Sequence, residues 1–115
     1  MAQYSAVLDG VLDGVFVALA DPTRRAVVGR LGRGPASVGD LARDAPMTLP
    51  SFMKHVRVLE SNGLIRTTKS GRVRMCELDP ERFELVDDWL AEQRRIWADR
   101  TDRLERFVTT PEENR

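Results

Sequence analysis

One segment, TLPSFMKHVRVLESNGLI (residues 48–65), restricts the fold more than any other part of the chain. Thr48 can cap a helix with its hydroxyl group, and a proline such as Pro50 is tolerated in a first turn. Asn62-Gly63 supplies the left-handed exit that commonly ends a helix. Between these ends, apolar residues recur at helical spacing and predict a buried stripe of Leu49, Phe52, Met53, Val56 and Leu59. The segment therefore predicts an amphipathic helix with both ends marked.

The face opposite this apolar stripe carries Ser51, Lys54, His55 and Arg57 and no acidic residue. A face of this kind either meets solvent alone or meets a polyanion. On duplex DNA, Lys54 and Arg57 would gain from the phosphates. Ser51 and His55 could reach base edges, and Arg57 is also expected to influence which base pairs are preferred.

Three helices are predicted before this one. The first covers residues 5–19, where apolar residues recur at helical spacing. The second starts at an Asp21 cap, has a proline in its first turn and stops at Gly34-Pro35. The third opens at Ser37, which resembles the start of a capping box, and runs to about Ala45. The expected buried residues of the second helix are Val27, Val28 and Leu31.

Two short β-rich runs follow in LIRTTKSGRVRMCELD, joined by Lys69-Ser70-Gly71, and predict a hairpin. The hairpin is basic at its tip, where Lys69, Arg72 and Arg74 are expected to contact phosphates or the minor groove. A short helix, a turn, a second helix with a basic outer face and then a basic hairpin form the layout of a winged helix-turn-helix. We therefore expect a mainly α fold with a small β-hairpin, namely five helices plus a β-wing.

The fifth helix is predicted from Asp79-Pro80 onward, over about 28 residues without Gly or Pro. Such a helix extends about 42 Å, longer than the core of one small domain can cover. Part of its apolar stripe is therefore expected to pack against the first helix of its own or a partner chain, which predicts a homodimer through the first and last helices. The residues expected in this interface are Leu8, Leu12, Phe16, Trp89, Ile96, Trp97, Leu104 and Phe107. Residues 1–110 would form the DNA-binding and dimerisation domain, and residues 111–115 a disordered tail.

The formal net charge of zero conceals an uneven distribution of charge. Residues 1–21 carry three acids and no Lys or Arg, residues 22–78 carry eleven Lys/Arg and four acids, and residues 79–115 carry seven Lys/Arg and eleven acids. The basic middle is typical of a polyanion-binding unit, although a solvated charged surface is the alternative. With 115 residues, no run long enough for a membrane helix and no signal peptide pattern, the expectation is one cytoplasmic domain without membrane association.

Four stretches of the chain resemble one known family: ALADPTRRAVVGRL, PASVGDLA, MTLPSFMKHVRVLESNGLI and GRVRMCELDP, followed by a long tryptophan-containing helix. They are similar to the arsenical-resistance-repressor (ArsR) family of small winged-helix regulators, in particular to a subgroup without the usual metal ligands. The resemblance covers nearly the whole chain. It implies a dimer through the first and last helices and repression of an operator, often the regulator's own promoter.

Metal sensing is not expected. The segment that corresponds to the metal-binding cysteine motif of the family is Ser37-Val38-Gly39, which has no thiolate, and the last helix contains no histidine. The single cysteine, Cys76, excludes an internal disulfide and alternates with Arg74 and Leu78 in the second β-run. We expect it to be a small apolar residue half buried against the core. The alternative is a redox-active thiol whose pKa is lowered by Arg72 and Arg74.

An enzyme is not expected, because the chain has no phosphate-cradling glycine loop and no plausible Ser/His/Asp grouping, and no cofactor is implied. His55 has no obvious acid or nucleophile as a partner in the sequence. Two alternatives to a simple repressor stay open. One is a winged-helix module used only for protein–protein contacts, and the other is a DNA-binding sensor with a small-molecule effector of unknown identity in the dimer interface.

Overall fold

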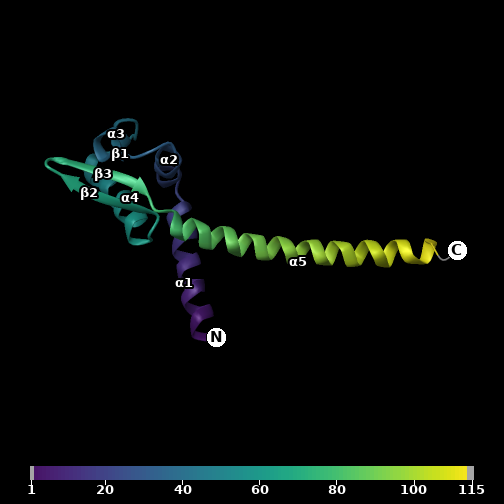
Figure 1. The fold of residues 1–115 in the computed structure, drawn as a ribbon. Helices are drawn as coiled ribbons and strands as arrows, with labels where there is room; N and C mark the ends of the chain where they lie inside the picture. The colour runs from purple at the N-terminus through teal and green to yellow at the C-terminus, as the bar shows by residue number, and fades with distance from the viewer. Residues whose placement is uncertain (1, 114–115) are drawn as a thin grey trace. The chain divides into compact units, whose positions relative to one another are not determined.

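The computed structural model describes residues 2–113 and contains five helices and a three-stranded sheet (Figure 1). Contacts divide the chain into two compact units, Met1–Glu84 and Leu85–Arg115. The elements in chain order are α1 (Ala2–Leu19), α2 (Pro22–Leu31), β1 (Ala36–Ser37), α3 (Val38–Arg43), α4 (Leu49–Ser61), β2 (Ile65–Ser70), β3 (Val73–Leu78) and α5 (Pro80–Glu113). The five helices and the wing confirm the predicted fold class.

Side chains cap three helices as the sequence predicts. Asp21 Oδ2 accepts a hydrogen bond from the Arg24 backbone N–H at 3.0 Å and starts α2. Ser37 Oγ accepts from the Asp40 backbone N–H at 3.0 Å and starts α3, and Thr48 Oγ1 accepts from the Ser51 N–H at 3.4 Å and starts α4. Each cap satisfies one of the donors that a helix start leaves without an intrahelical partner. The α3 helix ends at Arg43, two residues before the predicted end.

The sheet contains one strand more than the predicted hairpin. Its order is β1-β3-β2, with β1 antiparallel to β3 through the pairs Ala36↔Cys76 and Ser37↔Met75. The hairpin turn is also displaced, because Lys69 and Ser70 pair with β3 and leave Gly71-Arg72 as the connection. Gly71 has a φ of 63°, a left-handed conformation that glycine adopts without a steric penalty.

The core of the first unit includes side chains from α1, α2, α3, α4 and all three strands. Its described buried apolar members are Leu12, Val15, Ala18, Val27, Leu31, Ala36, Val38, Phe52, Val56, Leu59, Leu64, Ile65 and Cys76. The expected burial of Leu49 is wrong, since 56% of that residue is exposed. Leu49 is the first residue of α4, and helical periodicity predicts which way a residue points but not where along the helix the core ends. Val28 and Met53 are only partly buried.

The second unit consists of one segment, residues 85–113 of α5. Several large apolar side chains of this segment are exposed, including Ile96, Trp97 (57%), Leu104 and Phe107 (77%). The helix continues to Glu113, so residues 111–113 are helical where a disordered tail is predicted, and residues 114–115 lie outside the described part. Within residues 2–113, none of the helices combines the length and the apolar character that a membrane span requires.

Candidate nucleic-acid interface

The α4 helix presents a polar face to solvent. Ser51, Lys54 and Arg57 are exposed, as the sequence predicts, while Phe52 and Val56 point into the core. The Thr48 cap and the glycine exit at Gly63, which has a φ of 74°, fix the two ends of this helix. The exposed side of α4 therefore carries two cations and a hydroxyl group that can donate to an anion.

The acid of α4, Glu60, is turned toward the wing. Its Oε2 accepts hydrogen bonds from the Thr67 backbone N–H at 3.2 Å and from Thr67 Oγ1 at 2.6 Å. The guanidinium of Arg74 donates to the same Thr67 hydroxyl at 3.1 Å. A chain of hydrogen bonds thus connects α4 to both long strands of the wing.

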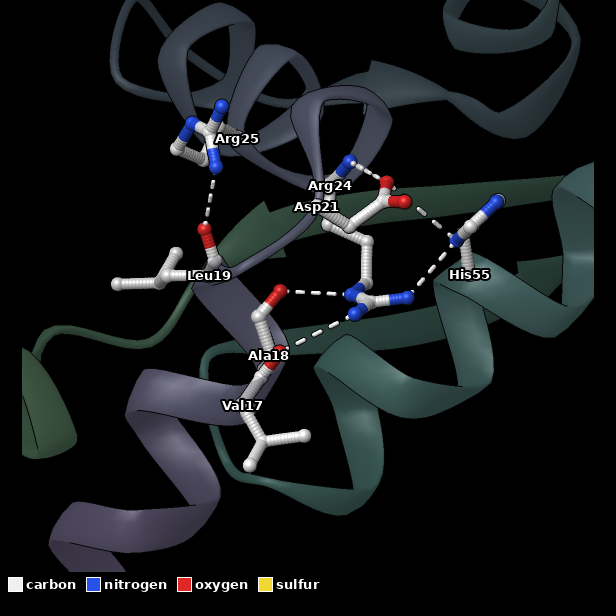
Figure 2. A network of polar contacts seen from close by, with 7 residues as sticks. All are labelled: Val17, Ala18, Leu19, Asp21, Arg24, Arg25 and His55. Atoms are coloured by element: carbon white, nitrogen blue, oxygen red, sulfur yellow. Dashed lines mark hydrogen bonds and ion pairs between the residues drawn. The ribbon is translucent and has the colours of Figure 1, made fainter.

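His55 lies at the edge of the polar face and differs most from its expected environment. Its side chain is only 22% exposed, and its Nδ1 lies 3.0 Å from Arg24 Nη1 and 3.7 Å from Asp21 Oδ2 (Figure 2). The expectation that His55 lacks an acidic partner is wrong. Its spacing contains a signal for partial burial, because His55 follows Phe52 by three residues and precedes Leu59 by four, next to the buried stripe.

The wing places two cations directly opposite each other. Lys69 and Arg74 are paired in the register of β2 and β3, and both are exposed. Because side chains alternate along a strand, they share the sheet face of the pairs Ile65↔Leu78 and Thr67↔Cys76, which carries buried Ile65 and Cys76 at its base. Like charges directly opposite each other destabilise a sheet, and an anion between them would relieve the repulsion. Arg72 is exposed in the turn itself.

Cys76 is fully buried in the central strand, which confirms the expected apolar packing on the core but is deeper than the half-buried position predicted. Burial raises the pKa of its thiol, and the nearby Glu60 carboxylate raises it further, against a smaller opposing effect of Arg74. A thiol in this state is protonated at neutral pH and is a poor nucleophile. The structure therefore places Cys76 in the core rather than at a reactive position on the wing.

A cavity of about 490 Å³ lies beside α2 and α3 in the first unit. Its lining combines buried Val27 and Phe52 with Leu41 and Ala45, and it includes the charged residues Arg30 and Asp40. Among the described residues, the His, Cys, Asp and Glu side chains form no group of three or more that could hold a metal ion.

The comparisons with known proteins agree on one family. Residues 19–68 match the helix-turn-helix domain family. The chain is 46% identical over 68 residues to the HTH-type transcriptional regulator Rv2034 of Mycobacterium tuberculosis, and this match covers 59% of this chain and 64% of that protein. It is 31% identical over 79 residues to the transcriptional repressor SdpR of Bacillus subtilis, and this match covers 69% of this chain and 88% of that protein.

Solved structures extend the similarity to three dimensions. The crystal structure of an ArsR family transcriptional regulator has a TM-score of 0.76 and 58% sequence identity to the chain, and the match covers 78% of this chain and 93% of that one. An ArsR-like transcriptional regulator from Rhodococcus sp. RHA1 has a TM-score of 0.73 and 25% identity over 93% of this chain and 96% of its own. The helix-turn-helix match, the curated relatives and these structures lead to one conclusion: the chain belongs to the ArsR family of transcriptional regulators.

Proposed function

We propose that the protein is a sequence-specific repressor that binds duplex DNA as a dimer. The observation that carries the proposal is the exposed, acid-free face of α4, which carries Ser51, Lys54 and Arg57. The facing cations Lys69 and Arg74 of the wing support it independently, because their repulsion favours an anionic partner. In this arrangement α4 is the reading helix and enters the major groove.

The reading helix and the wing have different tasks in DNA binding. Lys54 of the reading helix and the wing cations Lys69, Arg72 and Arg74 contact phosphates or the minor groove and position the protein. Ser51 and Arg57 of the reading helix reach base edges and provide sequence preference. His55 is not assigned a base contact, because its Nδ1 is already hydrogen-bonded to Arg24.

Binding-site selection with the purified protein, followed by titration on the selected operator and on random duplex, tests this assignment. Arg57→Ala should cost roughly 1 to 3 kcal/mol on the operator and relax one base-pair preference. Lys69→Ala should weaken binding about equally on both duplexes and flatten the salt dependence. Arg33→Ala, which removes an exposed cation two residues after the end of α2, is the control and should change neither the affinity for the two duplexes nor the salt dependence. Equal losses on both duplexes for Arg57→Ala would remove Arg57 from the specificity set.

The dimer is proposed from the exposed apolar residues on two helices. On α5 these include Ile96, Trp97 and Phe107, and on α1 they include Val7 and Phe16. Apolar area of this kind usually marks an interaction surface. Of the residues expected in the interface, Leu12 is only 4% exposed within the single chain, so it offers little surface to a partner. Sedimentation at micromolar concentration that shows only the 13.0 kDa species would contradict the dimer.

Two-fold symmetry determines the form of the operator. Two reading helices on one side of the duplex require an imperfect inverted repeat with half-site centres about 10 bp, or a small multiple of that, apart. Four or five cationic contacts in each protomer give about eight to ten per dimer, which corresponds to a log–log salt slope of about −7 to −9. Binding that lacks salt dependence on duplex DNA, together with salt-dependent capture of an acidic protein, would support the protein–protein module instead.

A further inference from the structure

Arg24, in the first turn of α2, joins three segments of the first unit. Its Nε donates to the Ala18 carbonyl at 2.6 Å and its Nη2 to the Val17 carbonyl at 3.1 Å, so it binds the end of α1 (Figure 2). Its Nη1 lies 3.0 Å from His55 Nδ1, in the middle of α4. One guanidinium thus connects the corner between α1 and α2, residues 17–24, to the proposed reading helix.

The chemistry of Arg24 determines the state of the His55 ring. A guanidinium is permanently charged and can only donate hydrogen bonds, so the nitrogen that it meets at 3.0 Å must accept. Imidazole Nδ1 accepts only in the neutral ring with the hydrogen on Nε2. Protonation of Nδ1 would place two hydrogen-bond donors, this N–H and the Arg24 Nη1, 3.0 Å apart. The carboxylate of Asp21, whose Oδ2 lies 3.7 Å from the same nitrogen, is the acceptor that a protonated ring could reach.

The Asp21 carboxylate can accept a hydrogen bond from a protonated ring throughout the pH range in which histidines titrate. The hydrogen bond from the Arg24 backbone N–H holds the pKa of the Asp21 carboxyl below its ordinary value of 3.8, against a smaller effect of desolvation. Histidine side chains change charge between about pH 5 and pH 8, where Asp21 is ionised. In the contacts that the structure describes, the charged groups at the His55 ring are Asp21 and Arg24. The end of α1 contributes backbone carbonyls to Arg24, and Thr67 of β2 engages Glu60 rather than the ring.

We propose that Arg24 and His55 are positioning residues for DNA binding. The neutral His55 ring holds the reading helix on the corner between α1 and α2, and protonation transfers the ring from Arg24 to Asp21 and weakens binding. This inference rests on the proposed DNA-binding function. The positioning role and a direct contact of His55 with a base or phosphate predict opposite changes of DNA affinity on protonation. A histidine that contacts DNA directly adds a positive charge when it is protonated and strengthens binding, whereas a histidine that must accept from Arg24 weakens it.

The contact itself can be tested without DNA. The chain contains one histidine, so the imidazole ¹⁵N signals in an NMR spectrum belong to His55. We expect the Nε2–H tautomer at pH 8 and loss of the Arg24 interaction in Arg24→Lys, which keeps the charge but not the planar fork. The matched control is Arg25→Lys, because Arg25 donates to the Leu19 carbonyl at 2.9 Å and makes no described contact with the ring. An Nδ1–H tautomer at pH 8 would overturn the proposal.

The role in binding is tested by fluorescence anisotropy on the selected operator, from pH 8 to pH 5.5 at constant ionic strength. The wild-type affinity should fall by about tenfold on acidification, the size expected for one lost hydrogen bond to a charged group. His55→Asn should bind more tightly than His55→Ala at every pH, because its amide oxygen can replace Nδ1 as an acceptor. Neither variant should show the acid-induced loss.

Three outcomes would contradict the positioning role. They are a wild-type affinity that rises on acidification, one that does not change, and equal affinities of the Asn and Ala variants. A wild-type chain without salt-dependent binding to duplex DNA at any pH would overturn the proposed function, and the positioning role with it. The tautomer signal would then still show whether the Arg24–His55 contact exists, which separates the two failures.

Discussion

Gly14 lies where α1 passes the C-terminal end of α4, and replacing it should reveal how closely the two helices approach. A Cβ atom at Gly14 would lie 2.4 Å from Asn62 Oδ1, whereas among the described residues a Cβ at Gly10 would meet no atom within 4 Å. Both glycines belong to α1, and alanine is favoured over glycine in a helix interior by about 1 kcal/mol. Gly10→Ala should therefore raise the free energy of unfolding by up to about 1 kcal/mol, and Gly14→Ala should lower it.

The size of the loss at Gly14 depends on whether Asn62 can move. Its Nδ2 donates to the Val58 carbonyl at 2.8 Å, and its backbone N–H donates to the same carbonyl at 3.2 Å. Displacing the amide group therefore costs a hydrogen bond, about 1 kcal/mol, in addition to about 1 to 3 kcal/mol for overpacking. After subtraction of the helix-propensity gain, Gly14→Ala should destabilise the protein by about 1 to 3 kcal/mol.

Urea unfolding followed by circular dichroism measures both variants. All samples need the same protein concentration, because association with a second chain would contribute to the apparent stability. Adding Asn62→Ala removes the Oδ1 atom, so Gly14→Ala should cost less in that background than in the wild type. An equal stabilisation by Gly10→Ala and Gly14→Ala would refute the close approach of α1 and α4.

Three further predictions concern the core and the wing. Phe52→Ala should lower the free energy of unfolding by about 3 to 5 kcal/mol, because the side chain is fully buried. Leu49→Ala should change it by less than about 0.5 kcal/mol, because Leu49 is exposed, and urea unfolding of both variants would show whether α4 enters the core at Phe52. The thiol of Cys76 should react with a maleimide far more slowly in the native protein than in urea at pH 8, and equal labelling rates would show that the strand opens. Because folding raises the pKa of this thiol, its contribution to the free energy of unfolding is present below the ordinary pKa of 9.0 and is lost as the pH rises above that value. Thr67→Val should weaken operator binding by about threefold to tenfold without changing the salt slope, because it removes the hydroxyl that joins Glu60 to Arg74 and leaves every cation in place. The bond from the residue 67 backbone N–H to Glu60 is kept. Anisotropy at several salt concentrations tests this, and an unchanged affinity would show that the hydroxyl has no role in binding.

Local interactions account for the part of the fold that could be predicted from the sequence. The caps at Asp21, Ser37 and Thr48 each join a side chain to a backbone N–H three residues later, so a short stretch of sequence contains both partners. The strand β1 was not predicted, since two residues show no periodicity and pair only with a distant strand.

The environment of His55 could not be predicted for a similar reason. Its contact with Arg24 joins residues that are 31 positions apart, so it depends on how α2 packs on α4. The sequence does show that His55 borders the apolar stripe, but it does not show which helix covers that border. Ser51, Lys54 and Arg57 were placed correctly because they lie farther from the stripe, where the direction of the side chain depends on helical periodicity alone.

The short strand β1 has a consequence for the thermodynamics of DNA recognition. It leads without a break into the Ser37 cap of α3, and it pairs with β3 beside the hairpin. The wing is therefore joined to the helix-turn-helix by a backbone ladder on one side and by the Glu60–Thr67–Arg74 hydrogen bonds on the other. A freely moving hairpin would lose conformational entropy on reaching the phosphates, and this loss would oppose association. Since the wing is already fixed in the free protein, most of that entropy is lost during folding. In the proposed complex with DNA, the wing cations would then contribute more of their attraction to the affinity.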